Sequence, residues 1–238
     1  MEASKKSPPS DDEMLELVKR DLRLSLSYLN QMNGLFHYDT MRALELCRTK
    51  EAEFSRQEIT YEEYGFWLRN LIRTCFAHFE GITFLMRQSA MWAAERSELS
   101  LTEVEAAKLA EEEVIGEGDQ KRRKKRFNSF QENFELAFKY FPQAFGANFR
   151  LNKGDVGWPT LLRAIQVRNA VTHPKKPSEF MISGVALKDV GDTVIWFGEV
   201  MSSALNACEA ASRKLAYPYG RADGNRKLRG SRSLTSER

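Results

Sequence analysis

Apolar side chains recur at every third or fourth position over residues 61–96, and this regular spacing is the strongest structural constraint in the chain. Such spacing places apolar side chains on one face of an α-helix. Thr60, with Glu63 three residues later, is a capping-box pattern that favours a helix start at this point. The sequence therefore predicts a long amphipathic helix with a buried stripe formed by Leu68, Ile72, Cys75, Phe79, Ile82 and Met86.

The same periodicity extends over most of the chain. Gly34, Gly116 and Pro142 are expected to end helices, whereas Pro159 suits the first turn of a helix. Only residues 180–187 compete as a short strand. We predict an all-α single domain over residues 11–217, with disordered ends at 1–10 and 218–238. The expected helices cover residues 11–33, 39–54, 61–96, 102–115, 127–141, 160–172, and a last segment from 184 or 189 to 215.

Composition excludes several classes of protein. The chain has 238 residues, of which 42% are hydrophobic and 29% charged, as is usual for a globular domain. No apolar run approaches the ~20 residues that span a bilayer, and the N-terminus lacks the apolar core of a secretory signal. Three separated cysteines and three histidines, with no metal-ligand spacing, predict neither a disulfide framework nor a metal site. We expect a cytoplasmic protein with no membrane partner.

Charge is concentrated in one stretch, although the net charge of the chain is only +3. Residues 103–119 are acidic, and we expect an acidic helix there that ends at Gly116. Six consecutive cations follow as a basic loop, and two interpretations of them stay open. They could contact RNA phosphates, or they could be a solvated loop that pairs with the preceding acids. These cations are Lys121, Arg122, Arg123, Lys124, Lys125 and Arg126.

Other conspicuous side chains have two interpretations each. Rotation by 100° per residue places Arg69, Arg73, Glu80 and Arg87 beside the buried stripe of the 61–96 helix, where they could line a cleft or form a salt-bridge network. His37 and His78 have no partner spacing and are expected to be structural. Four phenylalanines with helical spacing are expected in the core before a base-stacking role is considered; they are Phe127, Phe130, Phe134 and Phe138.

The stretch Val167–Pro174 places a cation, an amide and an imidazole at the end of an amphipathic helix. Asn169 and His173 are four residues apart and share a helix face. Pro174 disfavours the α conformation at His173, so the helix should end there and leave the imidazole free to turn toward Arg168. From the residues alone, His173 could equally serve only as a favourable cation at the helix C-terminus.

This RNxxxHP string, near the end of a helix that follows Trp158, resembles the motif of the HEPN (higher eukaryotes and prokaryotes nucleotide-binding) family. Phe76-x-x-Phe79-Glu80 in the long helix also looks like a major helix of such domains. The resemblance covers about residues 60–215, with residues 100–126 as an insertion. It implies an antiparallel helical bundle and a metal-independent endoribonuclease, of the kind found as toxins or defence and stress RNases. Many relatives are homodimers that join two motifs in one cleft.

The resemblance assigns roles to the motif. His173 would move protons, Arg168 would bind phosphate, and Asn169 would orient either group or the substrate during attack by the 2′-OH of RNA. No cofactor is implied, and the expected partners are RNA, a second copy of the chain, and a cognate antitoxin or defence-system protein. The alternative is a catalytically inactive adaptor that binds RNA or protein. Regulation by nucleotide binding ranks last, because the chain has no P-loop or GxGxxG motif.

Overall fold

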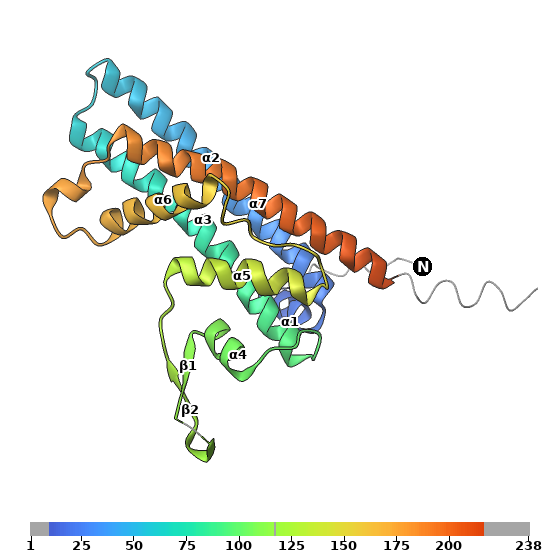
Figure 1. The fold of residues 1–238 in the computed structure, drawn as a ribbon. Coiled ribbons are helices and arrows are strands. Elements are labelled where there is room, and N and C mark those ends of the chain that lie inside the picture. The colour runs from blue at the N-terminus through green and yellow to red at the C-terminus, as the bar shows by residue number, and fades with distance from the viewer. Residues whose placement is uncertain (1–9, 117, 217–238) are drawn as a thin grey trace, which may run out of the picture.

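The structure, a computed structural model, describes residues 10–116 and 118–216 and is predominantly helical (Figure 1). The all-α prediction is therefore confirmed, apart from one small hairpin. The expected disordered ends lie outside the described residues except for Ser10, which is ordered and caps the first helix. The elements are α1 (Asp11–Arg20), α2 (Leu22–Ser55), α3 (Tyr61–Glu95), α4 (Glu103–Leu109), β1 (Glu112–Ile115), η1 (Gly118–Gln120), β2 (Arg122–Lys125), α5 (Phe130–Ala144), α6 (Gly157–Thr172), η2 (Pro177–Phe180) and α7 (Gly184–Ala216).

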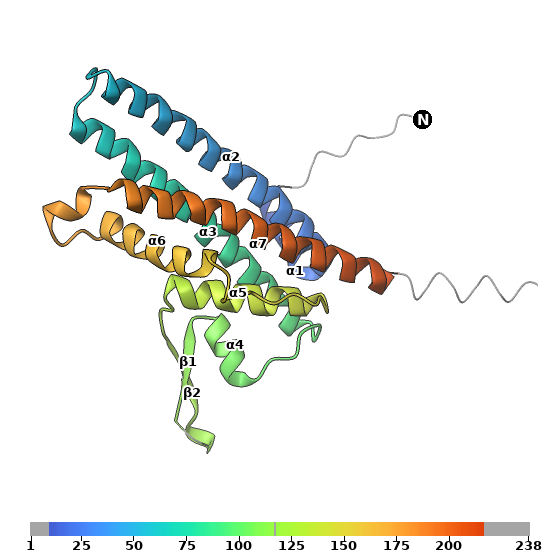
Figure 2. The ribbon, with the colours of Figure 1, turned by 45° about the horizontal axis from the view of Figure 1, so that its top comes forward.

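Two long antiparallel helices, α2 and α3, form one side of the molecule, and α6 and α7 form a second antiparallel pair beside them (Figures 1 and 2). The Thr60 hydroxyl accepts a hydrogen bond from the backbone N–H of Glu63 at 3.2 Å, so α3 starts where the sequence predicts. Ile72, Phe79 and Met86 have no exposed surface, which confirms the buried stripe.

The first expected helix, 11–33, begins at Asp11 as predicted but does not continue to residue 33 as one helix. The helix is interrupted at Asp21. The Asp21 carboxylate accepts a hydrogen bond from the Arg23 N–H at 2.8 Å and caps the start of α2. Gly34 does not end a helix, and α2 continues to Ser55. A glycine inside a helix costs only about 1 kcal/mol. Leu29 and Phe36 on either side of it pack into the core, and this packing outweighs the cost.

Phenylalanines of α3, α5 and α7 fill the centre of the core. The rings of Phe79 and Phe197 lie 4.5 Å apart between centroids, and the rings of Phe134 and Phe138 are equally close. Phe127 does not join them, contrary to expectation, because α5 begins only after it and its ring is 89% exposed.

The helix boundaries predicted for α5, α6 and α7 agree only in part with the structure. Pro159 lies in the first turn of α6, as predicted. Pro142 was expected to end α5, but the helix continues to Ala144 because N–H groups of the following turn bond the carbonyls of Pro142 and Gln143. Residues 180–187 form no strand, and α7 begins at Gly184, which matches the earlier of its two expected starts.

The expected acidic helix and basic loop are instead a short helix, α4, and an antiparallel hairpin, β1–β2. The register places Glu112 opposite Lys125 and Glu113 opposite Lys124. Cross-strand pairs of opposite charge stabilise this arrangement, whereas a helix would stack the acids together. Gly116 makes the turn possible with φ +87°, and a Cβ there would lie 2.6 Å from the Gln120 carbonyl oxygen.

A buried arginine anchors this insertion to the bundle. Arg87 of α3 is 3% exposed and donates from Nη2 to the Leu109 carbonyl at 2.9 Å, at the end of α4. Its Nη1 lies 3.5 Å from the Glu111 carboxylate, at the start of the hairpin. Burial lowers the pKa of Arg87, and the Glu111 charge opposes that shift. Arg87 therefore has a structural role and is not part of a cleft with Arg69 and Arg73.

Cys47, Cys75 and Cys208 are free and buried. Desolvation raises the pKa of the Cys47 thiol to about 11 and that of the other two to about 12. Among the described residues, no group of three or more potential side-chain ligands is placed to hold a metal ion. None of the helices described here has the length and apolar character needed to cross a bilayer.

Candidate functional site

The C-terminal half of α6 carries the predicted motif, and contacts at its N-terminal half fix this helix on α7. A Cβ at Gly157 would lie 2.0 Å from the Trp196 ring, so glycine is required for the close approach of the two helices. Arg163 of α6 then donates to Asp189 of α7, with Nη2 2.8 Å from one carboxylate oxygen and Nε 3.1 Å from both. Bidentate pairs of this kind fix orientation as well as distance.

Arg168 lies between α6 and α3. Its Nη2 forms an ion pair with the Glu80 carboxylate of α3, and its Nη1 donates to the Asn169 side-chain oxygen at 3.1 Å. The Arg168 side chain is 24% exposed and that of Glu80 38%. Three of the predicted residues are therefore in direct contact, and the guanidinium keeps part of its surface open to an incoming anion.

His173 terminates α6, as Pro174 predicts. Its backbone N–H donates to the Asn169 carbonyl at 2.9 Å, and its φ and ψ of −134° and 56° leave the helical region. The residue is exposed, and within the described ranges its imidazole has no hydrogen-bond partner. The ring is thus available for a ligand at the end of the helix that carries Arg168.

Arg69 and Arg73 of α3 bind the backbone around the end of α6. Arg73 Nη2 donates to the Val171 carbonyl at 3.3 Å, one of the last carbonyls of the helix. Arg69 Nη1 donates to the Phe180 carbonyl at 3.1 Å, and its guanidinium carbon lies 5.3 Å from the centroid of the Phe180 ring. The two predicted cleft residues therefore border the motif and hold the segment that follows it.

The six consecutive cations lie away from this motif, because the hairpin projects from the opposite side of α5 (Figures 1 and 2). Part of the pairing with the preceding acids that we considered is present, with Lys121–Glu103 at 3.4 Å and Arg123–Glu112 at 3.5 Å. Arg126 instead pairs with Glu132, which follows it in the sequence, at 2.9 Å. Lys124 and Lys125 are exposed and form no ion pair with any residue that the structure describes.

His78 is buried, as expected of a structural histidine. Its Nε2 lies 3.0 Å from the Asn33 side-chain oxygen and its Nδ1 3.3 Å from the Thr40 hydroxyl, both on α2. The loss of solvation lowers the pKa of His78 to about 4, so the ring is neutral at physiological pH. His78 therefore joins α2 to α3 and takes no part in proton transfer at the motif.

Comparison of the chain with protein-family models, with curated proteins and with solved structures finds no match. The roles of the motif residues therefore rest on the resemblance of the sequence motif and on the chemistry of these side chains. Sequence reasoning missed Phe180, whose contact with Arg69 depends on the path of a loop. It also missed the Arg163–Asp189 pair, because no spacing signal connects residues 26 positions apart on different helices.

Proposed function

We propose that this chain is a metal-independent endoribonuclease built on a helical bundle of the HEPN type. The observation that carries the proposal is the direct contact of Arg168 with both Glu80 and Asn169, on the same helix that an exposed histidine terminates five residues later. A phosphate group placed there would meet a fixed guanidinium and an imidazole. The antiparallel pairing of α2 with α3 and of α6 with α7 also supports the proposal.

The proposed reaction needs no water or metal in its first step. The 2′ oxygen of a ribose attacks the adjacent phosphorus and loses its proton, and the bond from phosphorus to the 5′ oxygen breaks as that oxygen gains a proton. The products are a 2′,3′-cyclic phosphate and a 5′-hydroxyl. Imidazole is the side chain that most readily exchanges protons near neutral pH, which makes His173 the proton carrier. Arg168 stabilises the negative charge that develops on the phosphate oxygens.

Glu80 is a positioning residue in this scheme. A free arginine side chain samples many rotamers, and ordering one costs up to about 2 kcal/mol. The Glu80 carboxylate holds the Arg168 guanidinium at the surface of α3 before substrate arrives. Since the guanidinium has five N–H donors, those not used by Glu80 and Asn169 can bind phosphate oxygens.

Two proton transfers are required, yet each chain offers one imidazole at the motif. A symmetric dimer that joins the ends of two α6 helices would supply the second, so we propose a homodimer with a shared cleft. Light scattering at micromolar concentration should then give twice the 27.4 kDa mass of the chain. An excess of His173→Ala chains should suppress wild-type activity more than dilution alone does.

The alternative is a catalytically inactive adaptor of the same fold that binds RNA or a protein such as a cognate antitoxin or defence-system protein. One observation favours it: exposed apolar side chains follow the motif, with Phe180 41%, Met181 62% and Val185 73% exposed. Apolar surface of this kind is typical of protein contacts. An adaptor would keep this surface without needing the imidazole of His173.

Cleavage of total RNA by the purified protein in excess EDTA separates these proposals. We expect cleavage that survives chelation, carries 2′,3′-cyclic phosphate ends, and is lost in His173→Ala. His37→Ala is the matched control, because His37 is also an exposed histidine but lies on α2. Circular dichroism should show that both variants fold. A His173→Ala variant with full activity would refute the nuclease mechanism, and the absence of any cleavage by the wild type would favour the adaptor.

A further inference from the structure

A cavity of about 600 Å³ lies beside α5, away from the motif on α6. Five cationic side chains from α4, α5 and the segments that flank α5 line it, against two carboxylates, Glu132 and Glu135. Like charges gathered in a hollow raise the local concentration of an oppositely charged ligand. The five cations are Lys108, Arg126, Lys139, Arg150 and Lys153.

Internal ion pairs account for only part of this charge. Arg126 binds Glu132 at 2.9 Å, Lys139 binds Glu105 at 3.2 Å, and Lys153 pairs with Glu135. Lys108 and Arg150 are exposed and form no ion pair within the ranges that the structure describes. The cavity therefore has unpaired positive charge that no internal carboxylate neutralises.

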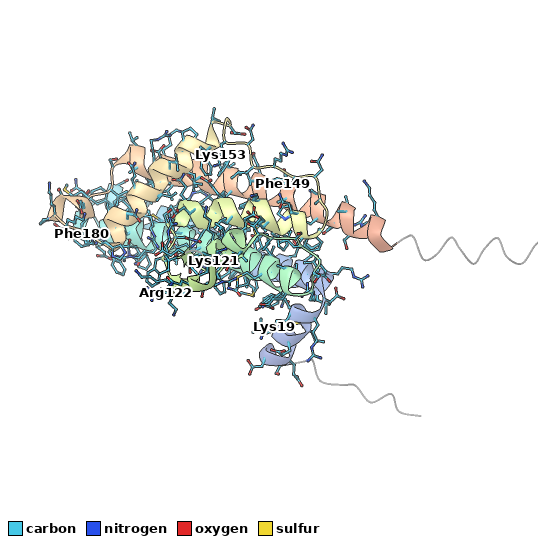
Figure 3. The ribbon with its side chains drawn as sticks, turned by 60° about the horizontal axis from the view of Figure 1, so that its bottom comes forward. Lys19, Lys121, Arg122, Phe149, Lys153 and Phe180 are labelled. Atoms are coloured by element: carbon cyan, nitrogen blue, oxygen red, sulfur yellow. The ribbon has the colours of Figure 1, made fainter. Side chains whose placement is uncertain are left out.

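Strand β2 continues this positive charge outward: Arg123 pairs with Glu112 of β1, whereas Arg122, Lys124 and Lys125 form no ion pair with a described residue. All four residues of β2 are exposed, and the chain passes from Lys125 directly to Arg126 at the cavity. Figure 3 shows Lys121 and Arg122 of the hairpin on one side of α5, and Phe149 and Lys153 of the loop after α5 on the other. A strand of four residues spans roughly 13 Å, which is enough to follow about two phosphates of an extended nucleic-acid backbone.

Phe127 is exposed to solvent, although phenylalanine is usually a core residue. Phe127 stands between Arg126 and Asn128, which both line the cavity, and its side chain is 89% exposed. Exposing a full phenyl ring forgoes the burial that usually stabilises such a side chain. Within the cavity itself, Phe149 is half-buried and supplies a second ring. Aromatic rings among phosphate-binding cations are the arrangement by which proteins bind single-stranded nucleic acid.

We propose that β2, Phe127 and the cavity beside α5 form a binding surface for single-stranded RNA, separate from the Arg168–His173 motif. Phe127 stacks on an unpaired base, while Arg150, Lys108 and the β2 cations bind the neighbouring phosphates. Double-stranded RNA offers the same phosphates, but its bases are already stacked and leave Phe127 without a partner. The proposal shares with the proposed function the premise that RNA is the ligand, and it adds where and in which form RNA is bound.

Fluorescence anisotropy with a labelled oligoribonucleotide of about 12 nucleotides tests this surface. Every 2′-hydroxyl of the probe is methylated, so that it binds without being cleaved by 2′-OH attack. Phe127→Ala should weaken Kd at least about fivefold, as loss of one stacked base does. Arg150→Ala should reduce the slope of log Kd against log salt by about 0.7 between about 50 and 200 mM, as loss of one phosphate contact does.

Matched controls come from α2, which lies outside this surface. Tyr38 is an aromatic side chain with 68% exposure, and Arg48 is an exposed arginine that forms no ion pair among the described residues. Tyr38→Ala and Arg48→Ala should leave both Kd and the salt slope unchanged. A duplex of the same sequence should bind Phe127→Ala as well as it binds the wild type.

The outcomes separate this proposal from the nuclease. Binding that depends on Phe127, in a protein that cleaves nothing, would reject the nuclease and support the surface. Cleavage in a protein whose Phe127→Ala and Arg150→Ala variants bind the probe normally would overturn the surface alone. RNA affinity that falls in Arg150→Ala but not in Phe127→Ala would also overturn the proposal, because it would indicate a ligand other than single-stranded RNA. Tighter binding of polyglutamate than of RNA would overturn it for the same reason.

Discussion

Acidification should destabilise this protein through His78, whose imidazole is 4% exposed between α2 and α3. Burial lowers its pKa to about 4 in the folded chain, whereas a histidine in an unfolded chain titrates near 6.5. Between these values the unfolded chain binds the proton and the folded chain does not. Stability is therefore lost as the pH falls from about 6.5 toward 4.

The size of the effect follows from the two pKa values. At pH 5 the unfolded imidazole is almost fully protonated and the folded one is almost fully neutral. The linkage relation then gives a loss of about 2 kcal/mol in the free energy of unfolding relative to pH 7. This is a large part of the roughly 5–15 kcal/mol that stabilises a typical domain.

Urea denaturation at pH 7 and pH 5 measures the loss, and His78→Phe isolates the contribution of this ring. Phenylalanine fits the surroundings, since the rings of Phe36, Phe79 and Phe197 have centroids within 5.9 Å of the His78 ring. The variant should lose about 1–2 kcal/mol at pH 7 with its hydrogen bonds, but should show a pH effect about 2 kcal/mol smaller than the wild type.

Comparison with His78→Phe removes the pH dependence that does not involve residue 78. His37→Gln, which changes the exposed neighbour on α2, should keep most of the wild-type pH dependence. Equal losses between pH 7 and pH 5 in wild type and His78→Phe would refute the reasoning.

Three further predictions concern packing. Gly157→Ala should lower the free energy of unfolding by about 1–3 kcal/mol, because its Cβ would overlap the Trp196 ring. Gly198→Ala on α7 has nothing within 4 Å and should raise it by roughly 0.5–1 kcal/mol, so thermal melting should move the two glycine variants in opposite directions. Arg87→Met should lower the free energy of unfolding by about 1–3 kcal/mol, because the Leu109 carbonyl loses its hydrogen-bond donor. Limited proteolysis within residues 110–126 should then become faster. An unchanged rate of cleavage would show that Arg87 does not anchor the hairpin.

Local signals in the sequence predicted those parts of the fold that local interactions determine. The stripe along α3 and its Thr60 cap place that helix within one residue of its observed end at Glu95. The hairpin could not be predicted in this way, since glutamate favours helix locally, whereas the register that places Glu112 and Glu113 opposite Lys125 and Lys124 appears only once the two strands meet. Gly34 likewise does not end a helix, because the neighbouring residues of α2 pack into the core.

One missed feature had a readable signal. Ser129 with Glu132 three residues later is a capping box, and the structure contains both of its hydrogen bonds. Reading it would have started α5 after Ser129 and left Phe127 outside the helix and the core. The helical spacing of the four phenylalanines concealed this, because Phe127 is in phase with Phe130 and Phe134 although the helix does not reach it.

At the candidate site the sequence predicted the helix end but not its partners. Pro174 was sufficient to place His173 at the terminus of α6. The rotation of α3 placed Glu80 beside the buried stripe, yet pairing of its carboxylate with Arg168 depends on how α6 lies along α3. Contacts between residues far apart in the sequence fix α6 in the bundle, among them Gly157 against Trp196 and Arg163 with Asp189, which both join α6 to α7.

The three buried cysteines make the chain a convenient host for a spectroscopic label. A thiol reacts as its thiolate, so Cys47, Cys75 and Cys208, with pKa values raised to about 11 or 12, should resist maleimides at neutral pH while the protein stays folded. A single cysteine introduced at the exposed Ser178 would then be labelled selectively, without removing any native thiol. In the proposed homodimer, spin labels at that position would report the distance between the two η2 segments, which follow the ends of the two α6 helices.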